Sequence, residues 1–209
     1  MAPISRSSDA ICLPAPRTTG RTSLEQAIAF RRSVRRYARD PLSLSGLGQL
    51  LWAGQGITDQ AGGLRAAPRA GATYPLELLA FVGEAGVTGL DAGVYEYLPE
   101  RHSLHLLHPG DRRPELSAAA LQQSFIQEAP ASILICANFA RTARHYGERA
   151  LRYVYLEAGH AAQNIALQAV ALGLASVPAG AFNDAAVRGL IGRDQAPDPV
   201  YLVSAGRLL

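Results

Sequence analysis

The sequence contains no lysine, so all 20 of its strongly basic side chains are arginines; against 17 acidic residues they give a formal net charge of +3. Guanidinium groups bind carboxylates and phosphates through paired hydrogen bonds, so basicity carried by arginine alone favours recognition of anions. The arginines are dispersed, and the sequence contains no recognisable nucleic-acid-binding module in which arginines alternate with aromatic residues. We therefore expect no nucleic-acid partner.

The chain also lacks long apolar runs and has only two cysteines. No run approaches the roughly 20 residues that a membrane span requires, and residues 1–20 lack the apolar core of a signal peptide. We expect a cytoplasmic protein with no membrane contact. Cys136 lies in an apolar run and is interpreted as a small core residue rather than a reactive thiol, and no disulfide framework is expected. Length and composition predict one domain, 21–209, after an irregular leader, 1–20.

Capping signals predict the first two helices. Ser23 and Gln26 have the spacing of a capping box, which predicts a helix from Leu24 to about Arg32. Ser43 is a second N-cap candidate, before a helix with leucines on one face that closes at the glycines 54 and 56.

Apolar patterning and turn residues predict the other elements. The expected strands are 77–82, 94–98 paired as a hairpin with 104–107, the buried 131–137, 176–179 and 200–205, and the expected helices are 114–127, 144–172 and 183–191. Because helices and strands do not alternate regularly, the predicted fold class is α+β, with a mixed central sheet flanked by helices.

Four arginines and a hydroxyl lie together at the end of the first predicted helix. They are Arg31, Arg32, Ser33, Arg35 and Arg36. Such a cluster could bind a phosphorylated cofactor. The alternative is structural, because the same arginines could neutralise the helix dipole and pair with surface carboxylates such as Asp40.

The run from Arg31 to the aromatic Tyr37 resembles the N-terminal flavin-binding signature of the nitroreductase family. Similar blocks follow at 50–56, 71–77, 146–149, 157–164 and 180–182, so the resemblance spans roughly Leu13 to Arg207. Together the blocks resemble the azoline dehydrogenase branch, which forms thiazoles and oxazoles in modified peptides. The resemblance implies a nitroreductase-like fold and an intertwined homodimer with FMN at its interface.

By this resemblance, Arg31, Ser33 and Arg35 would hold the FMN phosphate, ribityl chain and pyrimidine edge, with Arg32 in the same motif, and Arg207 would add a phosphate contact. The segment 178–181 matches the loop beside the flavin ring, where Pro178, Gly180 and Ala181 are the candidates and backbone amides reach N5. Ala72 and Tyr74 also align with cofactor-binding positions. Many nitroreductases have Asn and Gln in this segment, so this chain departs from simple nitroreductases there.

His145 and Tyr146 could form a proton-transfer pair. Azoline dehydrogenases typically have Lys-Tyr here, so the resemblance makes Tyr146 the candidate base. His145 replaces the lysine, and a neutral imidazole cannot supply its constant charge. The alternative is that both residues only cap or pack the following helix.

A polar stripe of Tyr153, Glu157, His160 and Asn164 follows helical spacing. It could line a site, but a buried hydrogen-bond network joining subunits is the favoured interpretation. No metal site is expected, because Glu157 and His160 lack companion ligands. No P-loop, nucleophile elbow or separate dinucleotide-binding motif is found.

Two enzymatic hypotheses and one non-enzymatic hypothesis result. The first is FMN-dependent oxidation of azoline rings in a peptide supplied by a cyclodehydratase partner. The second is an NAD(P)H-dependent reductase of nitro compounds or quinones, in which the nicotinamide meets the flavin directly. The third is a flavin- or anion-binding module without catalysis.

Overall fold

A seven-stranded sheet forms the centre of the computed structural model, which describes residues 10–193 and 195–209. Each pair of neighbouring strands in the sheet is antiparallel. In spatial order the strands are β1 (Ala10–Cys12), β8 (Ser103–Pro109), β7 (Gly93–Leu98), β5 (Leu76–Val82), β9 (Ala131–Ala137), β11 (Asp198–Arg207) and β10 (Leu174–Ala179). A parallel bridge between Ser33 and Ser176 at the β10 edge makes the arrangement mixed, as predicted.

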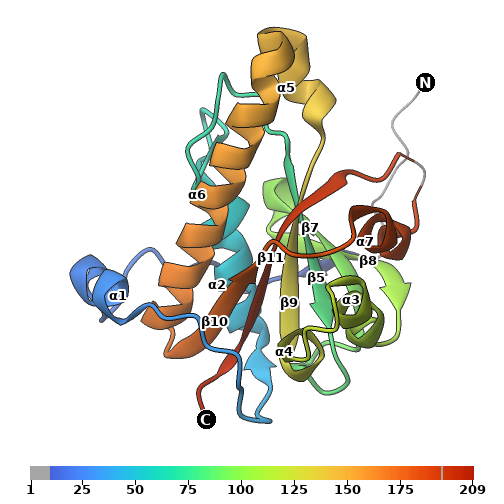
Figure 1. Cartoon of the computed structure of the whole chain (residues 1–209). Coiled ribbons are helices and arrows are strands. Elements are labelled where there is room, and N and C mark those ends of the chain that lie inside the picture. The colour runs from blue at the N-terminus through green and yellow to red at the C-terminus, as the bar shows by residue number, and fades with distance from the viewer. Residues whose placement is uncertain (1–9, 194) are drawn as a thin grey trace.

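Helices cover both faces of the sheet (Figure 1), which confirms the predicted α+β class. On one face lie α2 (Leu44–Gln55) and α6 (Ala150–Ala171), and on the other lie α3 (Arg113–Ala119), α4 (Phe125–Glu128) and α7 (Asp184–Ile191). The helix α1 (Leu24–Phe30) packs on the outer side of α6, and α5 (Phe139–Tyr146) stands beyond the far end of the sheet (Figure 1).

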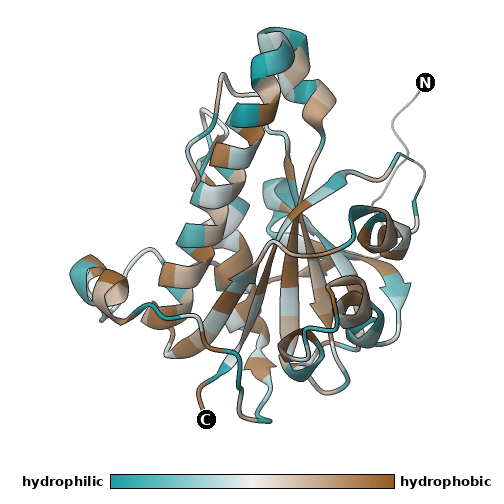
Figure 2. Ribbon diagram, in the orientation of Figure 1, coloured by the Kyte–Doolittle hydropathy of each residue, from teal (hydrophilic) through white to brown (hydrophobic). Residues whose placement is uncertain are grey.

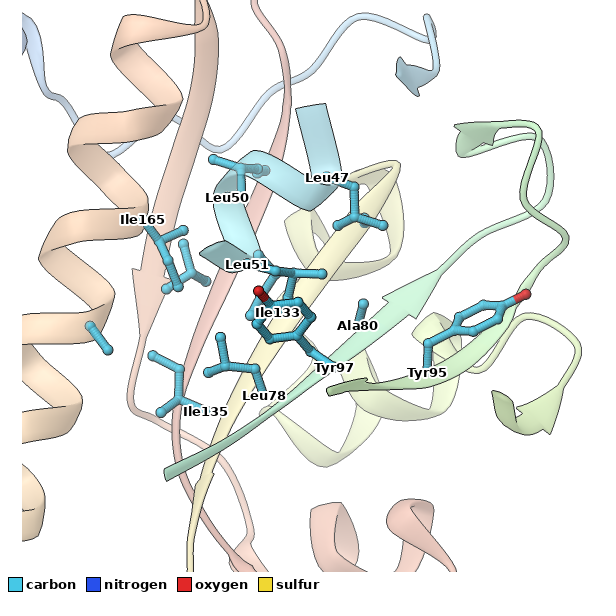
Figure 3. Close-up of a cluster of buried hydrophobic side chains, with 14 of the residues drawn as sticks. Leu47, Leu50, Leu51, Leu78, Ala80, Tyr95, Tyr97, Ile133, Ile135 and Ile165 are labelled. Carbon is cyan, nitrogen blue, oxygen red and sulfur yellow. The ribbon is translucent and has the colours of Figure 1, made fainter. Parts of the chain in front are cut away.

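The larger hydrophobic core lies between the sheet and the two helices α2 and α6 (Figure 3). Leu47, Leu50 and Leu51 of α2 are fully buried against Leu78 of β5 and Ile165 of α6. Burying one such side chain contributes about 2 kcal/mol relative to leaving it in water. Because both faces of the sheet are covered, β9 is apolar along nearly its whole length, and Cys136 within it is fully buried, as expected.

The two predicted N-caps, Ser23 and Ser43, are confirmed. The Ser23 side chain accepts from the Gln26 N–H while the Gln26 side chain accepts from the Ser23 N–H, which completes the capping box of α1. The Ser43 side chain accepts from the Gly46 N–H and caps α2, which ends before Gly56. The hairpin of β7 and β8, joined by the 3-10 turn η1 (Pro99–Arg101), is also confirmed.

Two predicted helices are wrong in extent. The helix expected over 114–127 is broken, because Leu121 and Gln122 adopt left-handed backbone angles and separate α3 from α4. The long helix expected from residue 144 starts at Ala150 instead. Gly147, with φ of 53°, ends α5, and the 3-10 turn η2 (Gly147–Arg149) leads into α6.

The N-terminal leader was predicted to be irregular, and this is wrong for residues 10–12, which form β1 and pair with β8. Residues 1–9 lie outside the described residues. Short pairs β2 (Leu42–Ser43) with β6 (Val87–Thr88) and β3 (Ile57–Asp59) with β4 (Leu64–Arg65) complete the fold. Within 10–193 and 195–209 no helix is long and apolar enough to cross a membrane.

Candidate functional site

The arginine segment runs along the open edge of the sheet. α1 ends at Phe30, so Arg31 is its C-cap residue and the chain continues in extended form. The Val34 N–H donates to the Ser176 carbonyl at 3.0 Å, which places the segment beside β10. This parallel contact explains why residues that follow a helix in the sequence lie beside a strand near the end of the chain.

The four arginines behave differently. Arg32 donates to the carbonyls of Ala29 and Arg31 at the end of α1. This is the role that the structural alternative predicts for it. The Arg35 guanidinium lies 5.9 Å from the centre of the Phe125 ring. Among the described residues, neither Arg31 nor Arg35 forms an ion pair, and none of the four pairs with Asp40. The charges of Arg31 and Arg35 are therefore available to an anion.

The loop 178–181 leaves β10 next to this segment. The Ala181 carbonyl accepts from the Gln123 side-chain amide at 2.9 Å, and the Asn183 N–H donates to the Ala119 carbonyl at 2.8 Å. The N–H groups of Ala181 and Phe182 have no hydrogen-bond partner in the described part of the chain. Gly180 and Ala181 are exposed, and Pro178 is half-buried. The loop therefore presents unused backbone donors.

Arg207 lies at the opposite end of the β10–β11 pair, opposite Leu174. Its carbonyl accepts from the Ala38 N–H at 3.0 Å. Arg207 lines a hollow of about 520 Å³ together with Arg17 and Ser43. Arg31, Ser33 and Arg35 are not among the residues that line this hollow.

Ala72 and Tyr74 lie in a strained loop before β5. Both have positive φ, of 55° and 46°. The Tyr74 hydroxyl donates to the Gly63 carbonyl at 2.6 Å, and the guanidiniums of Arg65 and Arg69 lie 4.5 and 4.3 Å from the centre of its ring. The Tyr74 side chain thus holds the loop in place instead of standing free.

The candidate base Tyr146 docks onto this loop. Its hydroxyl packs so closely on Gly71 that a β-carbon there would overlap with it. Its ring meets the Tyr153 ring edge to face, with centroids 5.0 Å apart. His145 is exposed, its ring centre lies 6.4 Å from that of Tyr146, and no hydrogen bond joins the two side chains among the described residues. The predicted pair is therefore adjacent but not linked.

Helix α5 is tied to the loop at two more points. The Thr73 and Thr142 hydroxyls are 2.9 Å apart and share a hydrogen bond. Arg141 donates to the Tyr74 carbonyl at 3.0 Å and to the Glu77 carboxylate at 2.6 Å. Arg193 bridges the same Glu77 to Glu96 on β7, at 2.9 Å from Glu96. This ion-pair network fixes the helix that carries Tyr146 to the end of the sheet.

The polar stripe on α6 does not form a network within the chain. Glu157 is 3% exposed, whereas His160 is exposed and Asn164 donates to the Ala66 carbonyl at 3.3 Å. Burial raises the pKa of Glu157 to about 7, and the nearby charges of Arg65 and Arg69 partly oppose the shift. No hydrogen bond joins the four side chains of the stripe in the described residues.

The donor set fits a phosphorylated flavin. Unpaired arginines match a phosphate, and free N–H groups on an open loop match the acceptors of a flavin ring edge. The predicted residues nevertheless fall into two groups, one at the Arg31–Arg35 segment with the loop 178–181, and one around Tyr74 and Tyr146. No hydrogen bond, ion pair or ring contact joins the two groups within the described chain.

Sequence reasoning missed the residues that hold these groups in place. Gln123, Arg141 and Thr142 act on the candidate loops across 58, 67 and 69 residues of sequence. They belong to no motif, and a single sequence carries no signal for such distant contacts. The two arginines over Tyr74, Arg65 and Arg69, lie outside every helix and strand that the sequence predicts.

Comparison with known proteins identifies the family to which the chain belongs. The model of the nitroreductase family matches residues 28–207. A protein of Methanocaldococcus jannaschii named as a nitroreductase is 45% identical over 184 residues, which cover 88% of this chain and 90% of the relative. The crystal structure of a protein of Ralstonia eutropha, also named as a nitroreductase, superimposes with a TM-score of 0.83 at 27% identity and covers 97% of this chain and 91% of that chain.

Two more distant structures share the fold. One is a Desulfovibrio desulfuricans protein named as a nitroreductase in complex with FMN, with a TM-score of 0.64, 23% identity and coverage of 90% and 87% of the two chains. The other is the Escherichia coli microcin synthetase McbBCD complex with a truncated peptide precursor, with a TM-score of 0.73, 21% identity and coverage of 97% and 79%. The fold, the extent of the family match and the identity to the Methanocaldococcus protein together show that this chain belongs to the nitroreductase family of oxidoreductases.

Proposed function

We propose that the chain is an FMN-dependent oxidoreductase. The observation that carries the proposal is the placement of Arg31, Ser33 and Arg35 beside the loop 178–181, where two backbone N–H groups lack partners. A fold relative binds FMN, which supports this choice of flavin. When bound, FMN supplies a two-electron acceptor and donor at its ring.

The residues of the chain divide the binding between them. The guanidiniums of Arg31 and Arg35 hold the phosphate and the pyrimidine edge, and Ser33 binds the ribityl chain, as the resemblance implies. Arg32, Pro178, Gly180, Ala181, Ala72, Tyr74 and Arg207 remain part of the proposed cofactor site. Because no hydrogen bond, ion pair or ring contact joins the Tyr74 group to the arginine segment within the described chain, we infer that a second chain supplies part of the site.

A homodimer provides that second chain. Three large apolar residues on α1 are exposed by more than half, namely Leu24, Ile28 and Phe30 at 62, 56 and 66%. Leu151, Tyr155 and Leu156 on α6 are exposed by 53–54%. Both helices carry brown, hydrophobic segments (Figure 2). Apolar surface of this kind on neighbouring helices is typical of a protein interface.

For the substrate, we propose an azoline ring in a modified peptide. Oxidation to the azole removes one carbon-bound proton and one hydride, and dioxygen is the final electron acceptor. Tyr146 takes the proton as general base, because its hydroxyl is fixed at Gly71 next to the proposed cofactor residues Ala72 and Tyr74. The likeness in fold to the microcin synthetase complex supports a cyclodehydratase as partner.

The alternative is an NAD(P)H-dependent reductase of nitro compounds or quinones. The observation that favours it is His145, which is exposed and makes no hydrogen bond to Tyr146 among the described residues, so it does not prime the tyrosine as a lysine would. The third hypothesis, a flavin- or anion-binding module without catalysis, needs only the arginines.

One experiment separates these functions. The FMN-loaded protein is incubated in air with an azoline-containing peptide and the cyclodehydratase that made it, and mass spectrometry follows the loss of two hydrogens per ring. In a parallel anaerobic arm, NADH or NADPH is added and the flavin absorbance is followed. Azole formation supports the dehydrogenase, bleaching by the nicotinamide without azole formation supports the reductase, and neither reaction in a flavin-loaded protein supports the binding module.

A further inference from the structure

Gln123 lies in the short turn between α3 and α4, and its side chain reaches the loop 178–181. The side-chain Nε2 donates to the Ala120 carbonyl at 2.8 Å and to the Ala181 carbonyl at 2.9 Å. Both hydrogens of the amide are therefore used on two main-chain oxygens, one in its own turn and one in the loop.

The turn that carries Gln123 has a strained backbone. Leu121 and Gln122 both adopt left-handed angles, with φ of 57° and 60°, which L-residues with side chains rarely do. The turn is held by the Ser117 hydroxyl, which donates to the Gln123 carbonyl at 2.9 Å, and by the Gln122 N–H, which donates to the Ser117 carbonyl at 3.0 Å. The strained turn aims Gln123 at the loop.

The hydrogen bond from Gln123 fixes the orientation of the peptide between Ala181 and Phe182. In a planar trans peptide the carbonyl and the next N–H point in opposite directions. With the Ala181 carbonyl held toward α3 by Gln123, the Phe182 N–H is turned away from α3. The Asn183 N–H donates to the Ala119 carbonyl at 2.8 Å, so the chain is held on both sides of the Phe182 N–H.

We propose that Gln123 is a positioning residue that sets the direction of the Phe182 backbone donor toward the flavin. The inference rests on the proposed function, because it requires FMN beside this loop. Gln123 itself does not touch the cofactor. It acts by orienting a donor that would bind the ring nitrogen that accepts the hydride. Such a donor stabilises the oxidised ring, whose nitrogen is a pure acceptor, more than the reduced ring, whose nitrogen carries a hydrogen.

The test uses Gln123→Met, which keeps the side-chain length but cannot donate. Its matched control is Gln127→Met, an exposed position on α4. Purified dimers are stripped of flavin and titrated with FMN, and the midpoint potential of the loaded protein is measured with redox dyes. For Gln123→Met the dissociation constant of oxidised FMN is expected to rise about three- to tenfold, the effect of one misplaced hydrogen bond. If the affinity for reduced FMN is unchanged, the potential becomes more positive by about 15–30 mV, at 29.6 mV per tenfold change for a two-electron couple.

The Gln127→Met control is expected to match the wild-type protein in both measurements. A folded Gln123→Met variant that matches the wild type in affinity and potential overturns the role of Gln123 while leaving FMN binding intact. If Gln123→Met does not fold, Gln123→Asn serves, because its amide is one methylene too short to reach both carbonyls, and the same shifts are expected. A wild-type protein that takes up no FMN overturns the proposed function, and the role of Gln123 falls with it.

Discussion

The hydroxyl of Tyr146 packs directly on the α-carbon of Gly71, so a glycine in the loop before β5 makes room for the candidate base on α5. Gly71 also has φ of 55°, which a residue with a side chain tolerates poorly. Two independent requirements, space and backbone angle, therefore select glycine at this position.

Gly71→Ala is expected to displace the Tyr146 hydroxyl and to lower the free energy of unfolding by about 1–3 kcal/mol, the usual cost of a clash combined with strain. Substrate oxidation should fall with it. Gly110→Ala is the matched control, since Gly110 has φ of 87° but open space around it. Urea unfolding and turnover are measured on both, and equal effects in the two variants would show that only backbone angle matters.

Tyr146→Phe is expected to reduce azoline oxidation by about 100-fold or more, the lower range for loss of a general base, while FMN binding stays unchanged. Tyr95→Phe, at a tyrosine of β7 whose hydroxyl donates to the Asp91 carbonyl at 2.8 Å, should leave the rate unaffected. Initial rates of azole formation are compared by mass spectrometry. Full activity in Tyr146→Phe would exclude this residue as the base.

Glu157→Gln should stabilise the protein at high pH. Burial raises the pKa of Glu157 from 4.5 to about 7 in the folded state, so folding favours the protonated form. Its stabilising contribution is present below pH 4.5 and is lost as the pH rises through 7, by at most about 3 kcal/mol. The variant, which stays neutral, should lose that pH dependence.

The free energy of urea unfolding is measured from pH 5 to pH 8.5 for this variant and for Glu148→Gln, an exposed control at the α5–α6 junction. Parallel curves for wild type and Glu157→Gln would contradict the raised pKa.

If the proposed homodimer forms through α1, Phe30→Glu is expected to convert it into a monomer, because a charge at the centre of an apolar interface cannot be hydrated there. Leu121→Glu, on the opposite helix layer and 67% exposed, is the control. Light scattering after size exclusion gives the mass, and circular dichroism confirms the fold. A Phe30→Glu variant that stays dimeric would place the interface elsewhere.

The elements that the sequence predicts well are those with local signals. The strand 131–137 follows from its apolar run between Pro130 and Asn138, and α1 and α2 follow from Ser23 and Ser43. The break between α3 and α4 was not predictable, because Leu121 and Gln122 are not residues that signal a left-handed turn. Likewise β1 has only three residues, and its pairing with β8 is decided by tertiary contact.

The same division applies to the candidate site. Motif resemblance pointed to the arginine segment and to the loop 178–181, and the bridge of Ser33 to Ser176 joins them. It could not indicate that Arg207 lines a hollow with Arg17 and Ser43, or that Gln123 and Thr142 hold the loops. Those contacts depend on how distant segments pack, which periodicity and capping do not encode.

FMN binding by the arginine segment is tested most directly by titrating flavin-free protein with FMN and comparing wild type with Arg31→Ala, Arg35→Ala and the exposed control Arg101→Ala. Each lost charge-assisted hydrogen bond is expected to weaken binding by about tenfold or more, and Arg101→Ala should bind as the wild type does. A yellow wild-type protein that binds one FMN per chain and loses it in the two segment variants is the predicted result. A colourless protein that does not take up added FMN would contradict it.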